Sequence, residues 1–322
     1  MIPIRDTIRS NTYPVVNYAI IAANMLVFLV ELSQGQKLNE FIYVYGLVPA
    51  RYAVPQISAY FTFGQQIVSF LSFMFLHGGF LHLLGNMWFL YIFGDNVEDR
   101  LGHSRYLVFY LLCGLTSGIS HLVINWYSEI PTIGASGAIA GVMGAYFLLY
   151  PGAKILTLVP IFIFIQFLEL PAYLFIGVWF LFQFLSATSA SAHAGGIAWW
   201  AHIGGFIFGM IFLKLFQMLP DAGSWSKLQR LTERRSTPRL QVIRPVRGED
   251  GNLYGVVSVA EHEAVFGARK LVNIAHGFKK KTFLLTIPPG ISDGTVLRLK
   301  EMGLQMADGV RGDLYLKVQV RS

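Results

Sequence analysis

The stretch PTIGASGAIAGVMGAYFLLYP, residues 131–151, contains a single serine, Ser136, among small and apolar residues. Two interpretations fit this pattern. Small residues allow membrane helices to pack closely, or the serine is a nucleophile at the beginning of an apolar helix. The composition of the chain and the position of its histidines distinguish between them.

The 322-residue chain is poor in charge. Charged residues make up 13% and hydrophobic residues 54%, whereas about 25% of a soluble domain is charged. This composition is typical of a polytopic membrane protein and argues against a soluble enzyme. Residues 1–220 hold 8 basic and 8 acidic residues, and residues 221–322 hold 17 and 10, which accounts for the net charge of +7. We therefore expect a membrane body and a basic, soluble tail.

Six apolar segments of the membrane body are expected to be helices, which predicts an all-α polytopic bundle. They lie at residues 14–33, 79–95, 105–126, 136–150, 170–187 and 197–218. Arginine and lysine gather in alternate connections, beginning with Arg5 and Arg9. By the positive-inside rule both termini are cytoplasmic, and Ser136 opens toward the extracytoplasmic side. We expect the inner or plasma membrane of a bacterial type of cell, with no cleaved signal peptide.

A serine nucleophile needs a general base, which is most often histidine. His202 lies about one and a half turns into the sixth segment, which enters from the same side as Ser136, so both are expected at a similar depth. His103 is expected to be solvated in a turn, and His121 to be a structural hydrogen-bonding group. No aspartate or glutamate is expected at the depth of His202, so the sequence permits a Ser–His dyad without a cofactor or metal ion.

Glycines explain how these two helices can approach. Gly137 and Gly141 line one face of the fourth segment, and Gly205 and Gly209 line one face of the sixth. Two such smooth faces allow close backbone contact, and a Ser–His hydrogen bond of about 3 Å becomes possible.

A second polar cluster lies in HGGFLHLLGNMWF, residues 77–89. His82 and Asn86 are four residues apart and share a helix face. Beside the backbone N–H of Ser136, they can form an oxyanion hole at a helix N-terminus. A buried pair that joins helices is the alternative interpretation.

Residues 12–218 resemble the rhomboid intramembrane serine proteases. Five motifs in the family's order carry the resemblance: YGLVP (45–49), HGGFLHLLGNMWFLYIFGDNVEDRLG (77–102), GASGAIAG (134–141), LPAYLFIGVWFLFQ (170–183) and AHIGGFIFG (201–209). It implies a six-helix bundle in the lipid bilayer that hydrolyses transmembrane protein substrates. Ser136 matches the nucleophile, His202 the general base, His82 and Asn86 the oxyanion hole, and Gly134 completes the Gly-x-Ser motif.

The sequence departs from the family pattern in two places. Many relatives carry an aromatic residue four positions after the serine, where Ala140 stands here, and the Trp-Arg pair of the first loop is missing. Ala140 is expected to loosen the positioning of His202. A catalytically silent relative that binds or escorts membrane clients is the alternative function, but the presence of Ser136 and His202 favours the enzyme.

The tail has two parts. Residues 221–247 form a basic linker, which fits either an anionic membrane surface or a solvated connection. Residues 248–322 read as short strands and resemble the C-terminal substrate-binding domain of DnaJ-type co-chaperones, which implies unfolded peptides or chaperone-related clients as partners. A purely structural module is the alternative. The His-Pro-Asp motif of J-domains is absent, and no aromatic pattern accompanies the charge as nucleic-acid binding would require.

Overall fold

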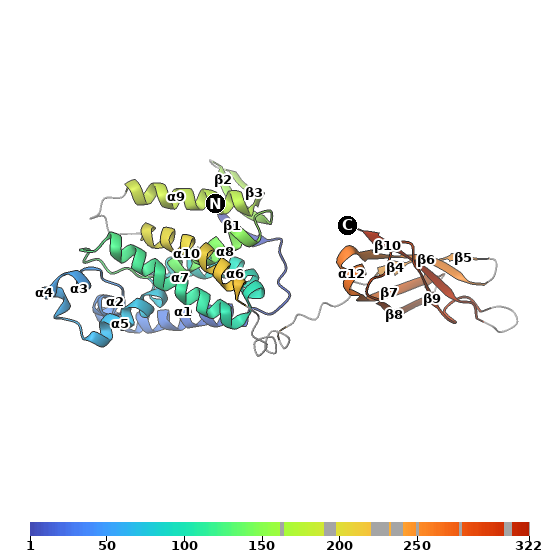
Figure 1. The fold of residues 1–322 in the computed structure, drawn as a ribbon, viewed down its shortest axis with the longest axis horizontal. Helices are drawn as coiled ribbons and strands as arrows, with labels where there is room; N and C mark the ends of the chain where they lie inside the picture. The colour runs from blue at the N-terminus through green and yellow to red at the C-terminus, as the bar shows by residue number, and fades with distance from the viewer. Residues whose placement is uncertain are drawn as a thin grey trace. The chain divides into compact units, whose positions relative to one another are not determined.

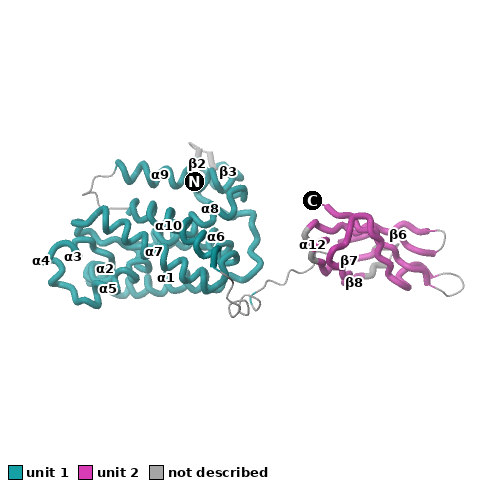
Figure 2. The backbone as a smooth tube through the Cα atoms, in the orientation of Figure 1, with its two compact units in different colours: residues 1–234 teal, residues 235–322 magenta. Residues whose placement is uncertain are grey.

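A computed structural model describes residues 1–161, 164–189, 198–219, 232, 241–248, 251–276, 279–305 and 311–321. The chain forms two compact units, Met1–Arg234 and Arg235–Ser322, which Figure 2 distinguishes by colour. Each unit has its own hydrophobic core.

Each of the six segments expected in the membrane body is a helix (Figure 1). These helices are α1 (Val15–Ser33), α6 (Phe80–Leu101), α7 (His103–Ile124), α8 (Ser136–Leu149), α9 (Ala172–Ser189) and α10 (Trp199–Met218). The helix α6 continues to Leu101, beyond the expected end at residue 95. The extra turns carry acidic side chains that bind the N-terminal segment, so polar sequence here still forms helix.

Apolar length identifies this unit as a membrane body. Among the described residues, α1, α7, α9 and α10 are each long and apolar enough to cross a membrane. The pair Phe63–Phe75 and Phe80–Leu101 passes the same test with a bend of 76° between its two parts. The helix α8 has only 14 residues and is buried from Gly137 to Tyr146, because the other helices surround it.

The helices α8 and α10 pack backbone to backbone at their glycines. A β-carbon on Gly205 would overlap the carbonyl oxygen of Gly137, and one on Gly209 would overlap that of Gly141. β-Carbons on Gly137 and Gly141 would in turn run into side chains of α7. The four glycines singled out in the sequence therefore meet at one interface, and any larger residue would push the helices apart.

The connection between α1 and α6 is largely helical. It contains η1 (Gly35–Lys37), α2 (Leu38–Tyr45), α3 (Ala50–Ala53), α4 (Pro55–Ser58), α5 (Phe63–Ser72) and η2 (Phe73–Phe75). Arg51 is fully buried in it, donates hydrogen bonds to the carbonyl oxygens of Tyr43 and Val44, and lies 3.8 Å from the ring centroid of Phe61. A buried guanidinium with these partners holds the connection in one conformation.

A small sheet joins the N-terminus to the connection before α9. Strand β1 (Ile2–Asp6) pairs antiparallel with β2 (Lys154–Ile161), and β2 pairs antiparallel with β3 (Phe164–Pro171). No strand was predicted from the sequence in either region. The pairing of β1 with β2 joins residues about 150 positions apart, such as Ile2 and Leu158, and local patterning carries no signal for such a partner.

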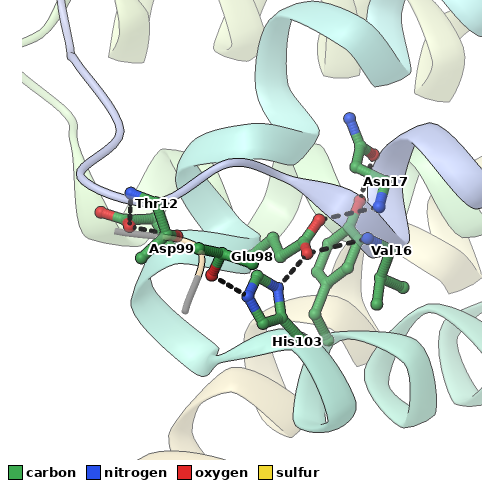
Figure 3. Close-up of polar contacts among 8 residues, drawn as sticks. Thr12, Val16, Asn17, Glu98, Asp99 and His103 are labelled. Carbon is green, nitrogen blue, oxygen red and sulfur yellow. Dashed lines mark hydrogen bonds and ion pairs between the residues drawn. The ribbon is translucent and has the colours of Figure 1, made fainter. Parts of the chain in front are cut away.

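A buried acidic network holds the start of α1, as Figure 3 shows. The carboxylate of Glu98 accepts the backbone N–H groups of Val16 (3.0 Å) and Asn17 (2.7 Å) and contacts Nδ1 of His103. Nε2 of His103 lies 2.6 Å from Oγ1 of Thr232. The prediction that His103 is solvated is wrong, because its ring is buried between these two partners.

The second unit consists of two sheets. One has the strand order β5 (Val246–Arg247), β6 (Leu253–Ala260), β10 (Leu314–Arg321) and β9 (Val296–Leu299); the other has β4 (Gln241–Ile243), β7 (Ala268–His276) and β8 (Lys279–Ile287). The helix α12 (Glu261–Phe266) follows β6. Alternate residues of β6 and β10 are buried, including Val257 and Val318, and they build the core. The strands β4 and β5 lie within residues 221–247, where the sequence suggested a linker.

Candidate active site

Ser136 is the first residue of α8. It follows Gly134, which has φ +125° and donates its N–H to the carbonyl oxygen of Phe73 at 2.8 Å. A β-carbon on Gly134 would lie 2.9 Å from Cε1 of His82. Glycine is required here both for the backbone conformation and for the approach of the histidine, and this turn aims the serine into the bundle.

His202 lies in the first turn of α10 and contacts Ser136 directly. Nε2 of His202 is 2.7 Å from Oγ of Ser136. Nδ1 of the same ring is 2.7 Å from Oε1 of Gln183, which belongs to α9. Three helices thus place a hydroxyl, an imidazole and an amide in one hydrogen-bonded row.

Two tryptophans flank the imidazole. The ring centroid of Trp179 lies 6.1 Å from that of His202, with 32° between the planes, and the centroid of Trp199 lies 6.2 Å away at 88°. Ala140 is fully buried. Aromatic contacts from α9 and α10 therefore surround the ring, although no aromatic side chain comes from position 140.

His82 and Asn86 lie beside the serine. The N–H of Gly78 donates to Nδ1 of His82 at 3.3 Å, so the other ring nitrogen of His82 carries the proton when the ring is neutral. Nδ2 of Asn86 is buried and has no hydrogen-bond partner among the described residues. A buried donor left unsatisfied is costly, which is typical of a group reserved for a ligand.

Two cavities share these four polar residues. One has a volume of about 290 Å³ and is lined by apolar side chains of α6, α8 and α9, such as Phe89, Met143 and Trp179. The other, of about 620 Å³, lies beneath residues 130–134. The residues common to both cavities are His82, Asn86, Ser136 and His202. The serine hydroxyl therefore stands where the two cavities meet.

Sequence reasoning missed Gln183, Trp179 and Trp199. The signal for Gln183 was present, because it is a lone amide in an otherwise apolar membrane helix. Which side chain it contacts depends on how α9 packs, and the sequence does not contain that information. No group of three or more His, Cys, Asp or Glu side chains that could hold a metal ion occurs within the described parts of the chain.

Comparisons with known proteins match both parts of the chain. Residues 64–218 match the Rhomboid domain, and residues 245–322 match the DnaJ C terminal domain. Rhomboid protein 1, mitochondrial, of Saccharomyces cerevisiae is 30% identical over 205 residues, which are 61% of this chain and 51% of that protein. Rhomboid protease GluP of Bacillus subtilis is 32% identical over 136 residues, 42% of this chain and 24% of that protein.

A third relative is Presenilin-associated rhomboid-like protein A, mitochondrial, of Danio rerio. It is 26% identical over 231 residues, which are 64% of this chain and 56% of that protein. The chain thus spans between 24% and 56% of the length of these three relatives.

Proposed function

The chain belongs to the rhomboid family and carries a DnaJ C-terminal domain, and from this premise we propose that it is an intramembrane serine endopeptidase. The observation that carries the proposal is the 2.7 Å hydrogen bond between Oγ of Ser136 and Nε2 of His202 inside a bundle of apolar helices. Its substrates are membrane proteins, which it cuts in or near their transmembrane segments.

The geometry supports a two-step acyl transfer. Nε2 of His202 takes the proton of Ser136 as Oγ attacks the scissile carbonyl carbon, and it then gives that proton to the leaving amine. Water, activated by the same nitrogen, hydrolyses the acyl-enzyme. The negative oxygen that forms in each step faces Nδ2 of Asn86, the ring of His82 and the N-terminus of α8.

The two cavities have separate roles in this proposal. The cavity beside Phe89 and Trp179 receives the substrate segment, because most of its exposed lining is apolar while its polar side chains gather at the serine. The larger cavity beneath residues 130–134 supplies the water that hydrolysis consumes. The serine stands between the hydrocarbon-like side and the aqueous side.

The test replaces each member of the dyad. Ser136→Ala and His202→Ala should each abolish cleavage of a transmembrane substrate in detergent while thermal unfolding stays nearly unchanged. Ser120→Ala is the matched control, since the hydroxyl of Ser120 bonds to the carbonyl oxygen of Thr116 within α7. Wild-type turnover by Ser136→Ala would overturn the assignment and favour a silent protein that escorts membrane clients.

We also propose an orientation and a division of the chain. Residues 1–220 are the protease domain, 221–247 the juxtamembrane connection, whose last residues carry strands β4 and β5 of the second unit, and 248–322 the rest of the β-domain. The distribution of lysine and arginine favours two cytoplasmic termini, with the active site opening to the other side, and we place the protein in a bacterial-type inner or plasma membrane. Protease added to inverted vesicles should digest the tail, whereas protease added to intact cells should not. Digestion in intact cells would reverse the orientation.

The DnaJ C-terminal domain has a role in choosing substrates under this proposal. With a cytoplasmic C-terminus, it holds extended cytoplasmic segments of clients at a sheet edge. Truncation after Leu240 should leave cleavage of a generic substrate unchanged in detergent and alter which native substrates are cut in cells. An unchanged set of native products would identify the domain as purely structural.

A further inference from the structure

Gln183 is a buried amide on a helix whose neighbouring residues are apolar. Its side chain belongs to a residue that is 7% exposed, and its Oε1 lies 2.7 Å from Nδ1 of His202. We propose that Gln183 is the positioning residue of the dyad, which fixes the tautomer and ring orientation of His202 through a neutral hydrogen bond. This inference rests on the proposed protease function, since it assigns a role within the same site.

The tautomer follows from the hydrogen-bonding groups. A neutral imidazole has one N–H and one lone pair, and an amide oxygen only accepts. With Oε1 of Gln183 facing Nδ1, the proton resides on Nδ1, and the lone pair of Nε2 faces the hydroxyl of Ser136. The opposite tautomer would place two lone pairs against each other at 2.7 Å. Gln183 thus keeps His202 in the form that can accept a proton.

The amide also decides which charge state of the ring is favoured. Among the described residues no carboxylate hydrogen-bonds to His202, and the titratable groups that act on it are His82 on α6 and His121 on α7. A carboxylate in place of the amide would stabilise the protonated ring, which cannot act as a base. A neutral partner orients the ring without this effect, so the base remains available at lower pH.

Two tryptophans also restrain the ring of His202, and the hydrogen bond to Gln183 adds what they cannot provide. Trp179 and Trp199 flank the imidazole, which limits tilting, but a flanking contact does not distinguish the two ring orientations that differ by a half-turn about the Cβ–Cγ bond and place the nitrogens differently. The bonds at Nδ1 and Nε2 do so. Loss of the Gln183 bond therefore leaves the ring in place with its reactive nitrogen misdirected part of the time.

The kinetic test compares three variants of α9 in the full-length protein. Gln183→Ala should lower kcat about 10- to 100-fold with a much smaller change in KM, because the ground-state hydrogen bond to the base is lost, whereas Gln183 is only one of the residues that line the substrate cavity. Gln183→Glu should restore much of kcat at high pH and move the acidic limb of the pH–rate profile upward by about one unit. Thr188→Ala, an exposed hydroxyl on the same helix, should change neither.

The kinetic results distinguish a positioning role of Gln183 from a packing role. A kcat of Gln183→Ala within twofold of wild type, in a protein that depends on Ser136 and His202, would overturn the inference and leave the protease function standing. Failure of Gln183→Glu to shift the pH profile would reduce Gln183 to a packing residue. If no variant, wild type included, cuts any substrate, the protease function fails by itself.

If no protein, wild type included, cuts a substrate, a spectroscopic measurement can still test the inference. The ¹⁵N shifts of histidine-labelled protein, with His202→Ala used to assign the signal, should show the Nδ1–H tautomer in the wild type and a mixture of tautomers in Gln183→Ala. An unchanged Nδ1–H signal in Gln183→Ala would overturn the inference.

Discussion

Two buried histidines at opposite ends of the bundle have nearly the same partners and are used differently. His202 lies between a hydroxyl, Ser136, and a neutral amide, Gln183. His103 lies between a hydroxyl, Thr232, and the carboxylate of Glu98; Figure 3 shows its contact with Glu98. A hydroxyl, a ring and an acceptor in a row therefore do not identify an active site by themselves.

The surroundings of each histidine make the difference. Glu98 also accepts two backbone N–H groups of α1, so its acceptor capacity is used to hold a helix end. Around His202, Nδ2 of Asn86 has no partner among the described residues, and cavities reach Ser136. The polar groups around His103 are used to hold the structure together, whereas those around His202 leave a hydrogen-bond donor and a cavity for a ligand.

The largest effect should come from exchanging the two histidines for alanine. His202→Ala should lower the cleavage rate by about 10⁴-fold or more with little change in Tm. His103→Ala should keep cleavage and lower the Tm, because it removes a donor from the buried carboxylate of Glu98, at a cost of about 1–3 kcal/mol. Loss of activity in a well-folded His103→Ala would show that the two ends are coupled.

The asparagines extend the comparison. Asn86→Ala should lower the rate about 10²- to 10³-fold, the usual cost of one oxyanion donor, with no loss of Tm. Asn17 donates to the carbonyl oxygen of Leu90 and accepts from the hydroxyl of Tyr106, so Asn17→Ala should lower the Tm and leave the rate nearly unchanged. An Asn86→Ala variant with the wild-type rate would return Asn86 to a structural role.

A smaller effect on stability and activity is expected from changing the glycines where α8 meets α10, beside Ser136 and His202. In Gly205→Ala the new β-carbon meets the carbonyl oxygen of Gly137, and separating the helices should cost about 1–3 kcal/mol and stretch the Ser–His bond. Gly177→Ala on α9 is the control, because nothing lies within 4 Å of its β-carbon. Equal thermal unfolding of the two variants would contradict the close contact of α8 with α10.

The smallest effect concerns an exposed carboxylate of the second unit. The N–H of Glu301 and the guanidinium of Arg298 hold the pKa of Asp313 below its ordinary value. A lowered folded pKa contributes stability that is fully present above the unfolded pKa, about 3.9, and is lost as pH falls through the folded pKa. Asp313→Asn should therefore lower the Tm of this unit slightly near neutral pH, and the difference from wild type should vanish in strong acid. A difference that grew in acid would contradict this sign.

Much of the fold could be predicted from local patterns. Each of the six apolar segments is a helix, because hydrocarbon requires every backbone group to bond within its own segment. The strand-like run LYGVVSV (253–259) forms all but the last residue of β6, and GDLYLKVQV (312–320) covers all but the last residue of β10. The sheet of β1, β2 and β3 was not predicted: the partners β1 and β2 are far apart in the chain and leave no local trace, whereas β2 and β3 are consecutive strands that the sequence analysis missed.

The sequence alone determined which residue types this protein has for its chemistry: a serine after Gly134 at the start of an apolar helix, and a histidine in a glycine-lined one. Only the tertiary structure decided that Ser136 and His202 touch, that Gln183 is the second partner of the ring, and that His103 is buried against Glu98. The physical reason is that residue type and helical period set what a side chain can do and which face it lies on. Contacts between helices depend on how their surfaces pack, and that is a property of the whole bundle.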